Sequence, residues 1–464
     1  MRARDHGIVL GRLEPGPLDA ITDVAGVRVG HTTLVRGAGP RVVGEGPVRT
    51  GVTVVVPHDG DSFVEPVFAG CHRLNGNGEL TGLEWLRESG FLTSPIAITN
   101  THSVGVVRDA LIAHAIRHHP AGAEFWSLPV VGETYDGLLN DMNGFHVRPE
   151  HLDAALDGAT AGVVGEGSVG GGTGMICHEF KGGLGTASRL VAERDGGWCV
   201  GALVQANYGG RELLRIDGVP IGEAIPTSEV PSPWDAAEEL AKRAGRGGAA
   251  APGSGSIIVV LATDAPLLPH QCERLAQRAG LGIARMGGIG STSSGDIFVA
   301  FATGNRGLPE AALEPDVRRV IDVRMVEDTR MTPLFQAAVE ATEEAIVNAL
   351  LTAGTMIGAD GITAYGLDGD RVVEIMARHG RGPGGAAGVM ECGAGSRGRS
   401  SARTASSRLL AGHPACRLAG PGQGFFVSFA SLHARLARNA TSLSRDDPLV
   451  RPEIVRTAPL PSIR

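Results

Sequence analysis

The stretch Gly253-Ser254-Gly255-Ser256-Ile257-Ile258-Val259-Val260-Leu261-Ala262-Thr263-Asp264 contains an abrupt change of character. Within it, a glycine–serine loop turns into a continuous apolar run rich in β-branched residues. Such a run predicts a strand that is buried on both faces of a sheet. Ser256 stands at the boundary, so we expect the start of the strand to hold its hydroxyl group rigidly.

The junction between Gly255 and Ser256 has the residues that cleavage of the chain at this bond requires. An N-terminal serine carries a hydroxyl nucleophile and a free α-amine, whose reference pKa of about 7.7 to 8.0 lets it accept the hydroxyl proton. Gly255 has no Cβ, so it leaves its carbonyl open to attack and tolerates a strained peptide geometry. The competing interpretation is that Gly-Ser-Gly-Ser is an ordinary flexible linker.

Composition indicates a globular protein. The chain has 464 residues, of which 42% are hydrophobic and 20% charged, and it is long enough for two or three domains or for one large layered unit. The first residues lack the apolar core of a signal peptide, and no apolar run approaches the length of a bilayer span. We therefore expect a cytoplasmic protein with neither a membrane nor a nucleic acid as partner.

Short strands and helices alternate along the first 380 residues, which predicts an α/β or α+β layered fold. We expect strands at 27–29, 52–56, 95–99, 128–131, 161–164, 199–205, 256–263 and 297–301, and helices at 80–86, 103–118, 234–244, 269–279 and 332–353, with a turn and strand at 358–365 closing the regular part. Ser103 is the expected N-cap of its helix, and Gly280 is the expected end of the helix that begins at Pro269. Residues 226–255 are the best candidate for a linker.

The last 84 residues differ in kind. From Arg381 onward there are twelve arginines against four acidic residues, while the chain as a whole has a net charge of −8. Glycine, alanine, serine and arginine dominate, and no sustained periodicity is visible. We predict that the segment 381–464 is mostly disordered.

Several familiar motifs are absent or fail. The sequence has no Gly-x-Ser-x-Gly elbow, no His-Glu-x-x-His and no phosphate-binding loop. His114 and His118 have helical spacing, but such pairs are usually surface histidines. The Gly-x-Gly-x-x-Gly pattern at 165–170 runs into more glycines rather than a helix, so we reject a dinucleotide site. The six cysteines show no zinc-binding spacing and are interpreted as buried reduced thiols; they are Cys71, Cys177, Cys199, Cys272, Cys392 and Cys416. We expect no metal or organic cofactor.

Several blocks in order resemble the family of the L-aminopeptidase/D-esterase DmpA and the β-peptidyl aminopeptidases, a self-processing serine peptidase family. The likeness runs from about Gly7 to Gly380. The blocks are Ile21-Thr-Asp-Val-Ala-Gly-Val-Arg-Val-Gly-His31, Gly78-Glu-Leu-Thr-Gly82, Thr99-Asn-Thr-His-Ser-Val-Gly-Val-Val107, Lys181-Gly-Gly-Leu-Gly-Thr-Ala-Ser188, Ser256-Ile-Ile-Val-Val, Ala262-Thr-Asp-Ala-Pro266, Ser294-Gly-Asp-Ile-Phe298 and Glu340-Ala-Thr-Glu-Glu-Ala-Ile346.

The resemblance implies a four-layer α/β/β/α sandwich similar to that of N-terminal-nucleophile hydrolases. The precursor would become two chains, 1–255 and 256–380 with the tail after it, which remain one folded unit, and the processed heterodimers would assemble as a homotetramer. Its implied substrates are short peptides, amides or esters. The implied activity is that of an aminopeptidase acting through an acyl-enzyme on the nucleophile.

The resemblance also implies roles for individual residues. Ser256 matches the nucleophile and Asn207 the side chain of the oxyanion hole. Ser294 and Asp296 match the pair that orients the nucleophile and its amine, although the β-peptidyl members have Glu where this chain has Asp296.

The substrate side of the site is implied in the same way. Glu133 matches an acid that receives the N-terminal ammonium of the substrate, which makes chemical sense as a charge-assisted pair. Tyr135 is a candidate for the pocket wall. Two alternatives remain at this stage: an acyltransferase of the related self-processing fold, whose nucleophile is Thr rather than Ser, and a non-catalytic scaffold with an uncut linker.

Overall fold

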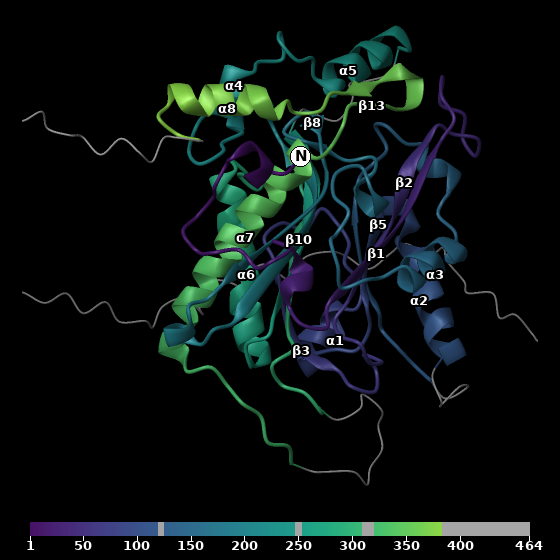
Figure 1. Cartoon of the computed structure of the whole chain (residues 1–464). Helices are drawn as coiled ribbons and strands as arrows, with labels where there is room; N and C mark the ends of the chain where they lie inside the picture. The colour runs from purple at the N-terminus through teal and green to yellow at the C-terminus, as the bar shows by residue number, and fades with distance from the viewer. Residues whose placement is uncertain (119–124, 246–252, 309–319, 383–464) are drawn as a thin grey trace, which may run out of the picture. The chain divides into compact units, whose positions relative to one another are not determined.

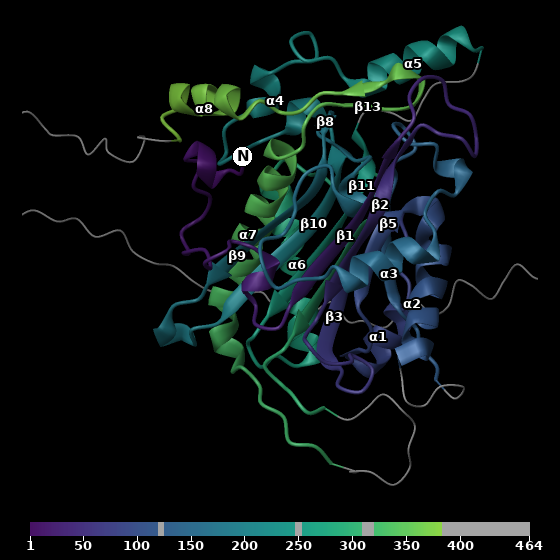
Figure 2. The same ribbon diagram turned by 45° about the vertical axis from the view of Figure 1, so that its right-hand side comes forward.

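The computed structural model describes residues 1–118, 125–245, 253–308 and 320–382, all of which belong to one compact unit. Two β-sheets face each other in this unit, and helices cover the outer face of each sheet (Figures 1 and 2). The expected four-layer α/β/β/α architecture is confirmed. The disorder predicted for residues 381–464 falls, from residue 383 onward, outside the described residues.

The first sheet has four strands in the order β1-β2-β5-β6. Their bounds are Arg28–Arg36, Val48–Val56, Ile96–Asn100 and Val130–Thr134. β1, β2 and β5 pair antiparallel, whereas β5 and β6 are parallel. Helices α2 (Val104–His118) and α3 (Pro149–Asp157) pack on its outer face through a core of valine, leucine and alanine side chains.

The second sheet has six strands in the order β4-β3-β12-β11-β10-β9. Their bounds are Phe91–Leu92, Val67–Arg73, Asp296–Ala302, Gly253–Thr263, Cys199–Gly209 and Gly183–Leu190. β11 and β12 are parallel, and the other pairs are antiparallel. Helices α6 (Pro269–Arg285) and α7 (Met331–Leu351) cover its outer face.

β11 is buried on both faces, as its apolar run predicts. Ile258, Val260 and Ala262 point into the core between the two sheets, whereas the residues that alternate with them pack against α6 and α7. Burial on both sides requires apolar side chains at every position, which explains the absence of an alternating pattern.

Smaller elements gather around the two sheets. Their bounds are α1 Leu83–Ser89, β7 Ile176–Cys177, β8 Phe180–Lys181, α4 Ile221–Ala224, α5 Pro233–Arg243, β13 Met356–Ile357, β14 Thr363–Ala364 and α8 Gly369–Arg378. α4, α5, α8, β8 and β13 lie at one end of the sandwich, at the top of Figures 1 and 2. α8 follows the turn and strand that was expected to close the regular part, so that boundary was placed too early.

Two predicted helix ends are wrong. α6 does not stop at Gly280 but continues to Arg285. The reason is packing: a Cβ at Gly282 would lie 2.7 Å from the Thr342 side chain and 2.9 Å from the Val339 carbonyl oxygen on α7, so a glycine is needed where the helices approach closely. The cap before α2 is Asn100, whose side chain accepts a hydrogen bond from the Ser103 backbone N–H.

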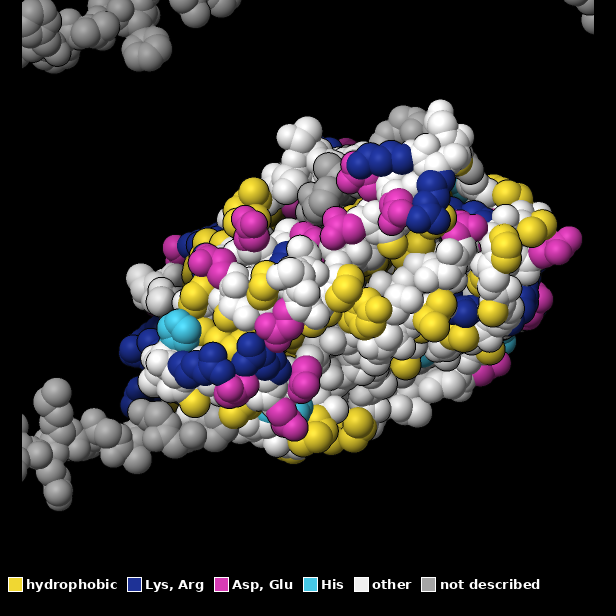
Figure 3. Space-filling view, turned by 90° about the horizontal axis from the view of Figure 1, so that it is seen from above, with side chains coloured by type: hydrophobic (Ala, Val, Ile, Leu, Met, Phe, Trp, Pro, Cys, Tyr) yellow, Lys and Arg dark blue, Asp and Glu magenta, His cyan; other side chains and the backbone are white. Residues whose placement is uncertain are grey.

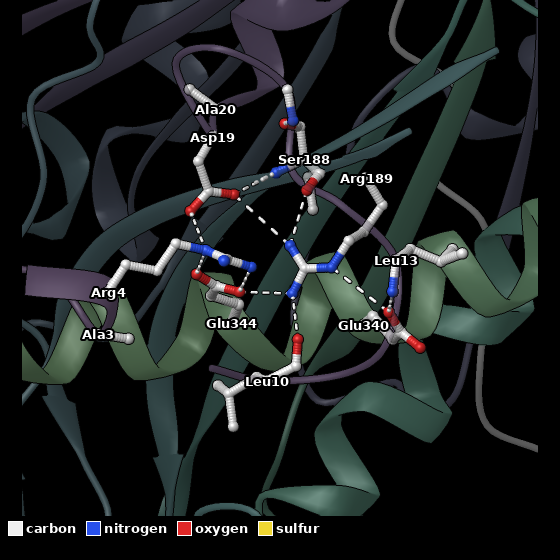
Figure 4. A network of polar contacts seen from close by, with 12 residues as sticks. Ala3, Arg4, Leu10, Leu13, Asp19, Ala20, Ser188, Arg189, Glu340 and Glu344 are labelled. Atoms are coloured by element: carbon white, nitrogen blue, oxygen red, sulfur yellow. Dashed lines mark hydrogen bonds and ion pairs between the residues drawn. The ribbon is translucent and has the colours of Figure 1, made fainter. Parts of the chain in front are cut away.

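The N-terminal segment is tied to the sandwich by a buried charge network (Figure 4). Arg189 at the end of β9 lies between Glu344 and Glu340 of α7 and Asp19 of the segment that precedes β1. The side chains of Arg189 and Glu344 are fully buried, and Arg4 adds a second cation, 2.7 Å from Glu344 and 3.3 Å from Asp19. The network joins three parts of the chain that are far apart in sequence.

Charged side chains of both signs are interspersed with small apolar groups at the end that carries α4, α5 and α8 (Figure 3).

The four cysteines in the described ranges are free and buried, as expected, while Cys392 and Cys416 lie outside these ranges. None of the helices in the described part of the chain combines the length and the apolar character that crossing a bilayer requires.

Candidate functional site

Ser256 and Asn207 are direct neighbours across two strands. Ser256 of β11 pairs with Asn207 of β10, and the register of the two strands shifts immediately after this pair. Both side chains are buried. The sequence predicted Ser256 as the first residue of its strand, and this prediction is wrong. β11 already begins at Gly253, which pairs with Gly209 beyond the irregularity.

Gly255 occupies a position where only glycine fits. Its φ of +153° is one that L-residues rarely adopt, and a Cβ there would lie 1.9 Å from the Asn207 carbonyl oxygen. The same Cβ would lie 3.2 Å from Nδ2 of Asn207. The side-chain amide of Asn207 is therefore beside the Gly255–Ser256 junction.

The amide of Asn207 is held in a defined orientation. Its Oδ1 accepts a hydrogen bond of 2.8 Å from the backbone N–H of Ile176, in β7. With the oxygen fixed in this way, the NH₂ group is the end of the amide that can donate toward the junction. Asn207 was expected at the end of a strand, but β10 continues to Gly209.

Gly295 provides a backbone donor to the Ser256 side chain. Its N–H donates to the Ser256 Oγ over 3.0 Å, and Ser294 and Asp296 flank it on either side. The Ser294 hydroxyl donates to Asp296 Oδ1 over 2.5 Å. Asp296 pairs with Ile257 in the parallel β11–β12 ladder, so the Ser294–Asp296 pair lies one residue from Ser256.

The carboxyl group of Asp296 is buried, and burial raises its pKa, while hydrogen bonds from Ser294, from the Ile257 N–H and from Asn75 partly oppose the rise. These donors support the charged form. The shorter side chain of Asp, compared with Glu, still reaches Ser294.

Glu133 lies inside β6, which extends three residues beyond the expected end at 131 and one beyond Glu133 itself. Its two carboxylate oxygens accept hydrogen bonds from the backbone N–H of Glu79 and from the Thr101 hydroxyl. Burial raises the pKa of Glu133, and these hydrogen bonds oppose the shift. No cation is paired with this carboxylate among the ion pairs of the described residues.

Gly78 brings Glu133 close to the nucleophile. A Cβ at Gly78 would lie 3.2 Å from Glu133 Oε1 and 3.0 Å from the Cα of Gly295, which is the residue that donates to Ser256. The absence of a side chain therefore lets the Gly78 backbone pack closely against both Glu133 and Gly295. Glu133 and the residue that donates to Ser256 thus both lie against Gly78.

Tyr135 lies just beyond β6 and is 40% exposed. Its hydroxyl oxygen lies 2.6 Å from the position of a Cβ on Gly137, so the ring folds back over the following turn. No contact among the described residues links Tyr135 to Ser256, and its role in a pocket wall stays a prediction.

Three contributors were missed from the sequence. The Gly295 N–H has no side chain to signal it, and Thr101 and Ile176 act through contacts that depend on the fold. Thr101 lies in a quoted block, Thr99 to Val107, but its hydroxyl could have been assigned to Glu133 only after β5 and β6 were known to be parallel neighbours. Within the described ranges, no three His, Cys, Asp or Glu side chains converge as they would at a metal site.

Comparison with known proteins places this chain among peptidases. The sequence model of peptidase family S58 matches residues 19–364. The β-peptidyl aminopeptidase BapA of Sphingosinicella microcystinivorans is 49% identical over 381 residues, which cover 82% of this chain and 93% of that protein. BapA of Sphingosinicella xenopeptidilytica is 44% identical over 382 residues, which cover 81% of this chain and 90% of that protein.

Two solved structures that resemble this chain are also aminopeptidases. The β-aminopeptidase of a Burkholderia species is 54% identical, with a TM-score of 0.75, and the match covers 82% of this chain and all of that one. The L-aminopeptidase D-Ala-esterase/amidase of Ochrobactrum anthropi is 42% identical, with a TM-score of 0.71, over 82% of this chain and 99% of that one. The latter is described as a prototype for serine aminopeptidases and a variant of the Ntn-hydrolase fold.

Proposed function

This chain belongs to peptidase family S58 and is a serine aminopeptidase, and from this premise we propose that it cleaves itself between Gly255 and Ser256 and then uses Ser256 as its nucleophile. The observation that carries the proposal is the arrangement at this junction. The Asn207 amide lies beside Gly255, and the Gly295 N–H donates to the Ser256 Oγ. A nucleophile and hydrogen-bond donors at one peptide bond are what acyl transfer requires.

Self-cleavage proceeds by an N-to-O acyl shift. The Ser256 Oγ attacks the Gly255 carbonyl carbon and gives up its proton, and the bond between that carbon and the Ser256 nitrogen breaks as the nitrogen takes up a proton. Water then hydrolyses the ester, which leaves a carboxylate on Gly255 and a free amine on Ser256. The unusual φ of Gly255 and the absence of a Cβ favour this step, because they admit the approach of the hydroxyl.

The same groups then serve hydrolysis of a substrate. The Ser256 Oγ attacks the substrate carbonyl, while the new α-amine of Ser256 accepts the hydroxyl proton and passes it to the leaving amine. Water then hydrolyses the resulting ester, which releases the acyl group as an acid and restores the Ser256 hydroxyl. Asn207 Nδ2 and a backbone N–H stabilise the oxyanion, and loss of one such donor typically lowers the rate by roughly 10²- to 10³-fold. Ser294 and Asp296 orient the nucleophile and its amine through the hydrogen bond between them and their position beside Ile257. The nucleophile, the base and the hydrogen-bond donors in these steps all belong to the chain, so the proposed reaction uses no cofactor.

Glu133 binds the N-terminal ammonium of the substrate. It is buried, held by Thr101 and the Glu79 N–H, and close to Gly295, so an ammonium beside it would place the first amide near Ser256. Tyr135 contributes to the wall of the pocket.

Similarity to the two BapA proteins and to the Burkholderia enzyme favours short peptides or amides with an N-terminal β-residue as substrates. Aminoacyl esters and amides are the second substrate class, from the O. anthropi enzyme. Membership of a peptidase family favours water over an amine as the acyl acceptor, and it argues against the uncut scaffold. We propose a homotetramer of processed heterodimers as the working assembly.

The first test is the mass of the purified protein. We expect two chains under denaturing conditions, one ending at Gly255 and one beginning with Ser256, because the junction carries its own nucleophile. N-terminal sequencing and intact mass measurement identify both ends. A chain that stays uncut after complete folding, or a cut at another bond, contradicts the proposal.

The second test concerns Glu133. Substrates with a free amine should be hydrolysed well and their N-acetylated forms poorly, and Glu133→Gln should raise KM by on the order of 10- to 100-fold, the size of a lost charged hydrogen bond. Thr81→Ser, a conservative change in the neighbouring loop, is the control. Equal turnover of free and acetylated substrates contradicts this role.

The acid limb of the pH profile gives a further readout of the same role. Because burial raises the pKa of Glu133 above its ordinary value, the carboxylate takes up a proton sooner as pH falls, and KM should rise at a correspondingly higher pH. In Glu133→Gln this rise in KM should be absent.

A further inference from the structure

Phe145 is an exposed aromatic residue in an unfavourable backbone conformation. Its φ and ψ are both 51°, the left-handed region that bulky residues rarely occupy, and 54% of the residue is exposed to solvent. Neither a favoured backbone nor burial of the ring explains a phenylalanine at this position. Such conformations persist only where the surroundings enforce them, and they occur often at functional sites.

The surroundings of Phe145 do enforce it. On one side, Asp141 accepts hydrogen bonds from His146 Nε2 and from the Gly44 N–H, both over 2.8 Å. The side chains of Asp141 and His146 are buried, and Arg36 holds the other ring nitrogen of His146 at 2.9 Å. The loop is thus fixed on both sides of Phe145, and the ring is presented by a rigid support.

The ring of Phe145 stacks on His102, with 5.9 Å between ring centroids and 17° between planes. His102 is exposed and follows Thr101, whose hydroxyl donates to Glu133. His102 is also close enough to Glu133 to lower the pKa of that carboxyl group slightly, against the dominant effect of burial. His102 therefore lies near the carboxylate proposed to anchor the substrate amine, and Phe145 stacks on His102.

We propose that the stacked rings of His102 and Phe145 form the wall that receives the side chain of the substrate's N-terminal residue, so that bulky apolar or aromatic residues are preferred over unsubstituted ones. This inference rests on the proposed function, since it uses Glu133 as the anchor of the substrate amine. Fixing the ammonium at Glu133 and the first carbonyl at Ser256 leaves the side chain of that residue as the group free to reach the rings.

The expected gain is modest and selective. An aromatic contact with offset rings adds about 0.5–1.5 kcal/mol beyond area burial, which corresponds to roughly 3- to 10-fold in kcat/KM. A wall of this kind acts only on substrates that carry a side chain long enough to touch it. It leaves the smallest substrate unaffected, and this separates it from a general effect on catalysis.

The test compares two para-nitroanilides with free amines, those of β-alanine and of β³-homophenylalanine, on the processed enzyme. Phe145→Asn removes the ring while keeping a residue that tolerates the left-handed region, and Phe145→Tyr keeps the ring. Leu281→Ala, at an exposed position on α6, is the control. The measured quantity is the ratio of kcat/KM for the large substrate to that for the small one.

We expect Phe145→Asn to lower this ratio about 3- to 10-fold through the large substrate alone, Phe145→Tyr to preserve it and Leu281→Ala to leave it unchanged. His102→Ala should shift it in the same direction as Phe145→Asn. An unchanged ratio, or equal loss for both substrates, overturns the inference. So does a change in assembly size with an unchanged ratio, because Phe145 would then serve a contact between copies. Failure of the wild-type enzyme to cut itself or to hydrolyse either substrate would instead be a failure of the proposed function.

Discussion

Replacement of Ser256 by alanine is expected to leave a single uncut polypeptide without measurable peptidase activity. Both reactions use the same oxygen: the Ser256 Oγ attacks the Gly255 carbonyl in processing and the substrate carbonyl in hydrolysis. The α-amine that serves as the base is also missing from an uncut chain, so the two losses occur together. Denaturing gels, intact mass measurement and hydrolysis of a free-amine para-nitroanilide report on both.

A matched control lies in the same stretch. Ser254→Ala changes a serine two residues earlier and should be cut and active like the wild type. The fold of Ser256→Ala should be intact, because within the described residues the hydroxyl bonds to the Gly295 N–H alone, and the flanking strand pairing does not depend on it. Cleavage that continues in Ser256→Ala, or that stops in Ser254→Ala, would show that another group is the nucleophile.

The strand β11 could be predicted from the sequence because a strand buried on both faces is apolar throughout. The strand expected at 161–164 does not form, and β3 and β9 were not predicted. The run Ile257 to Ala262 is apolar at every position, and the structure packs its alternate residues against the first sheet and against the two helices α6 and α7. The end of α6 was missed for the opposite reason. Gly280 has the sequence appearance of a helix stop, but glycine within α6 serves close packing, since the Cβ missing at Gly282 would collide with α7.

From the sequence we could name only those residues of the candidate site whose side chains have a proposed role. Ser256, Asn207, Ser294, Asp296 and Glu133 are quoted from blocks or strand ends in the sequence, and the structure groups them at one end of the two sheets. Backbone groups leave no such signal.

Two glycine positions show which features of the site could not be predicted from the sequence. The Gly295 N–H and the close packing at Gly78 follow from the approach of two loops that are far apart in the chain. Residues 75–78 and 291–295 meet through hydrogen bonds such as that from Asn75 Nδ2 to the Ser291 carbonyl, which no local pattern encodes.

The second large effect concerns stability. Arg189→Met is expected to lower the free energy of unfolding by about 3 kcal/mol, at the lower end of the 3–5 kcal/mol typical when one partner of a buried ion pair is removed. The Arg189 side chain is fully buried, and its removal leaves Glu344, also fully buried, without its nearest cation (Figure 4). Arg4 remains 2.7 Å from Glu344, and this second cation is the reason for expecting the smaller value.

The measurement is urea unfolding in the Ser256→Ala background, in which the chain remains one polypeptide. Lys242→Met is the control, because Lys242 forms an exposed pair with Glu238 on α5, and exposed pairs contribute little; no measurable change is expected. The double variant Arg189→Met/Glu344→Gln should recover part of the loss, since it removes the unpaired charge together with its partner. A loss in the double variant equal to the sum of the single losses would show that the two residues act independently.

The deficit of Arg189→Met should also shrink as pH falls. Burial and the neighbouring Glu344 carboxylate already raise the pKa of Asp19 to about 7 in the wild type, and removal of Arg189 removes a cation that lowers the pKa of Glu340 and forms an ion pair with Asp19. Carboxyl groups whose pKa is raised in the folded state bind more protons there than in the unfolded chain, between the unfolded and folded pKa values. Folding then becomes more favourable as pH decreases through that window, and more so in the variant than in the wild type. Urea unfolding at pH 8 and at pH 6 should therefore show a smaller difference in unfolding free energy between Arg189→Met and the wild type at pH 6. An equal difference at both pH values would mean that lost packing of the Arg189 side chain, and not unpaired charge, causes the deficit.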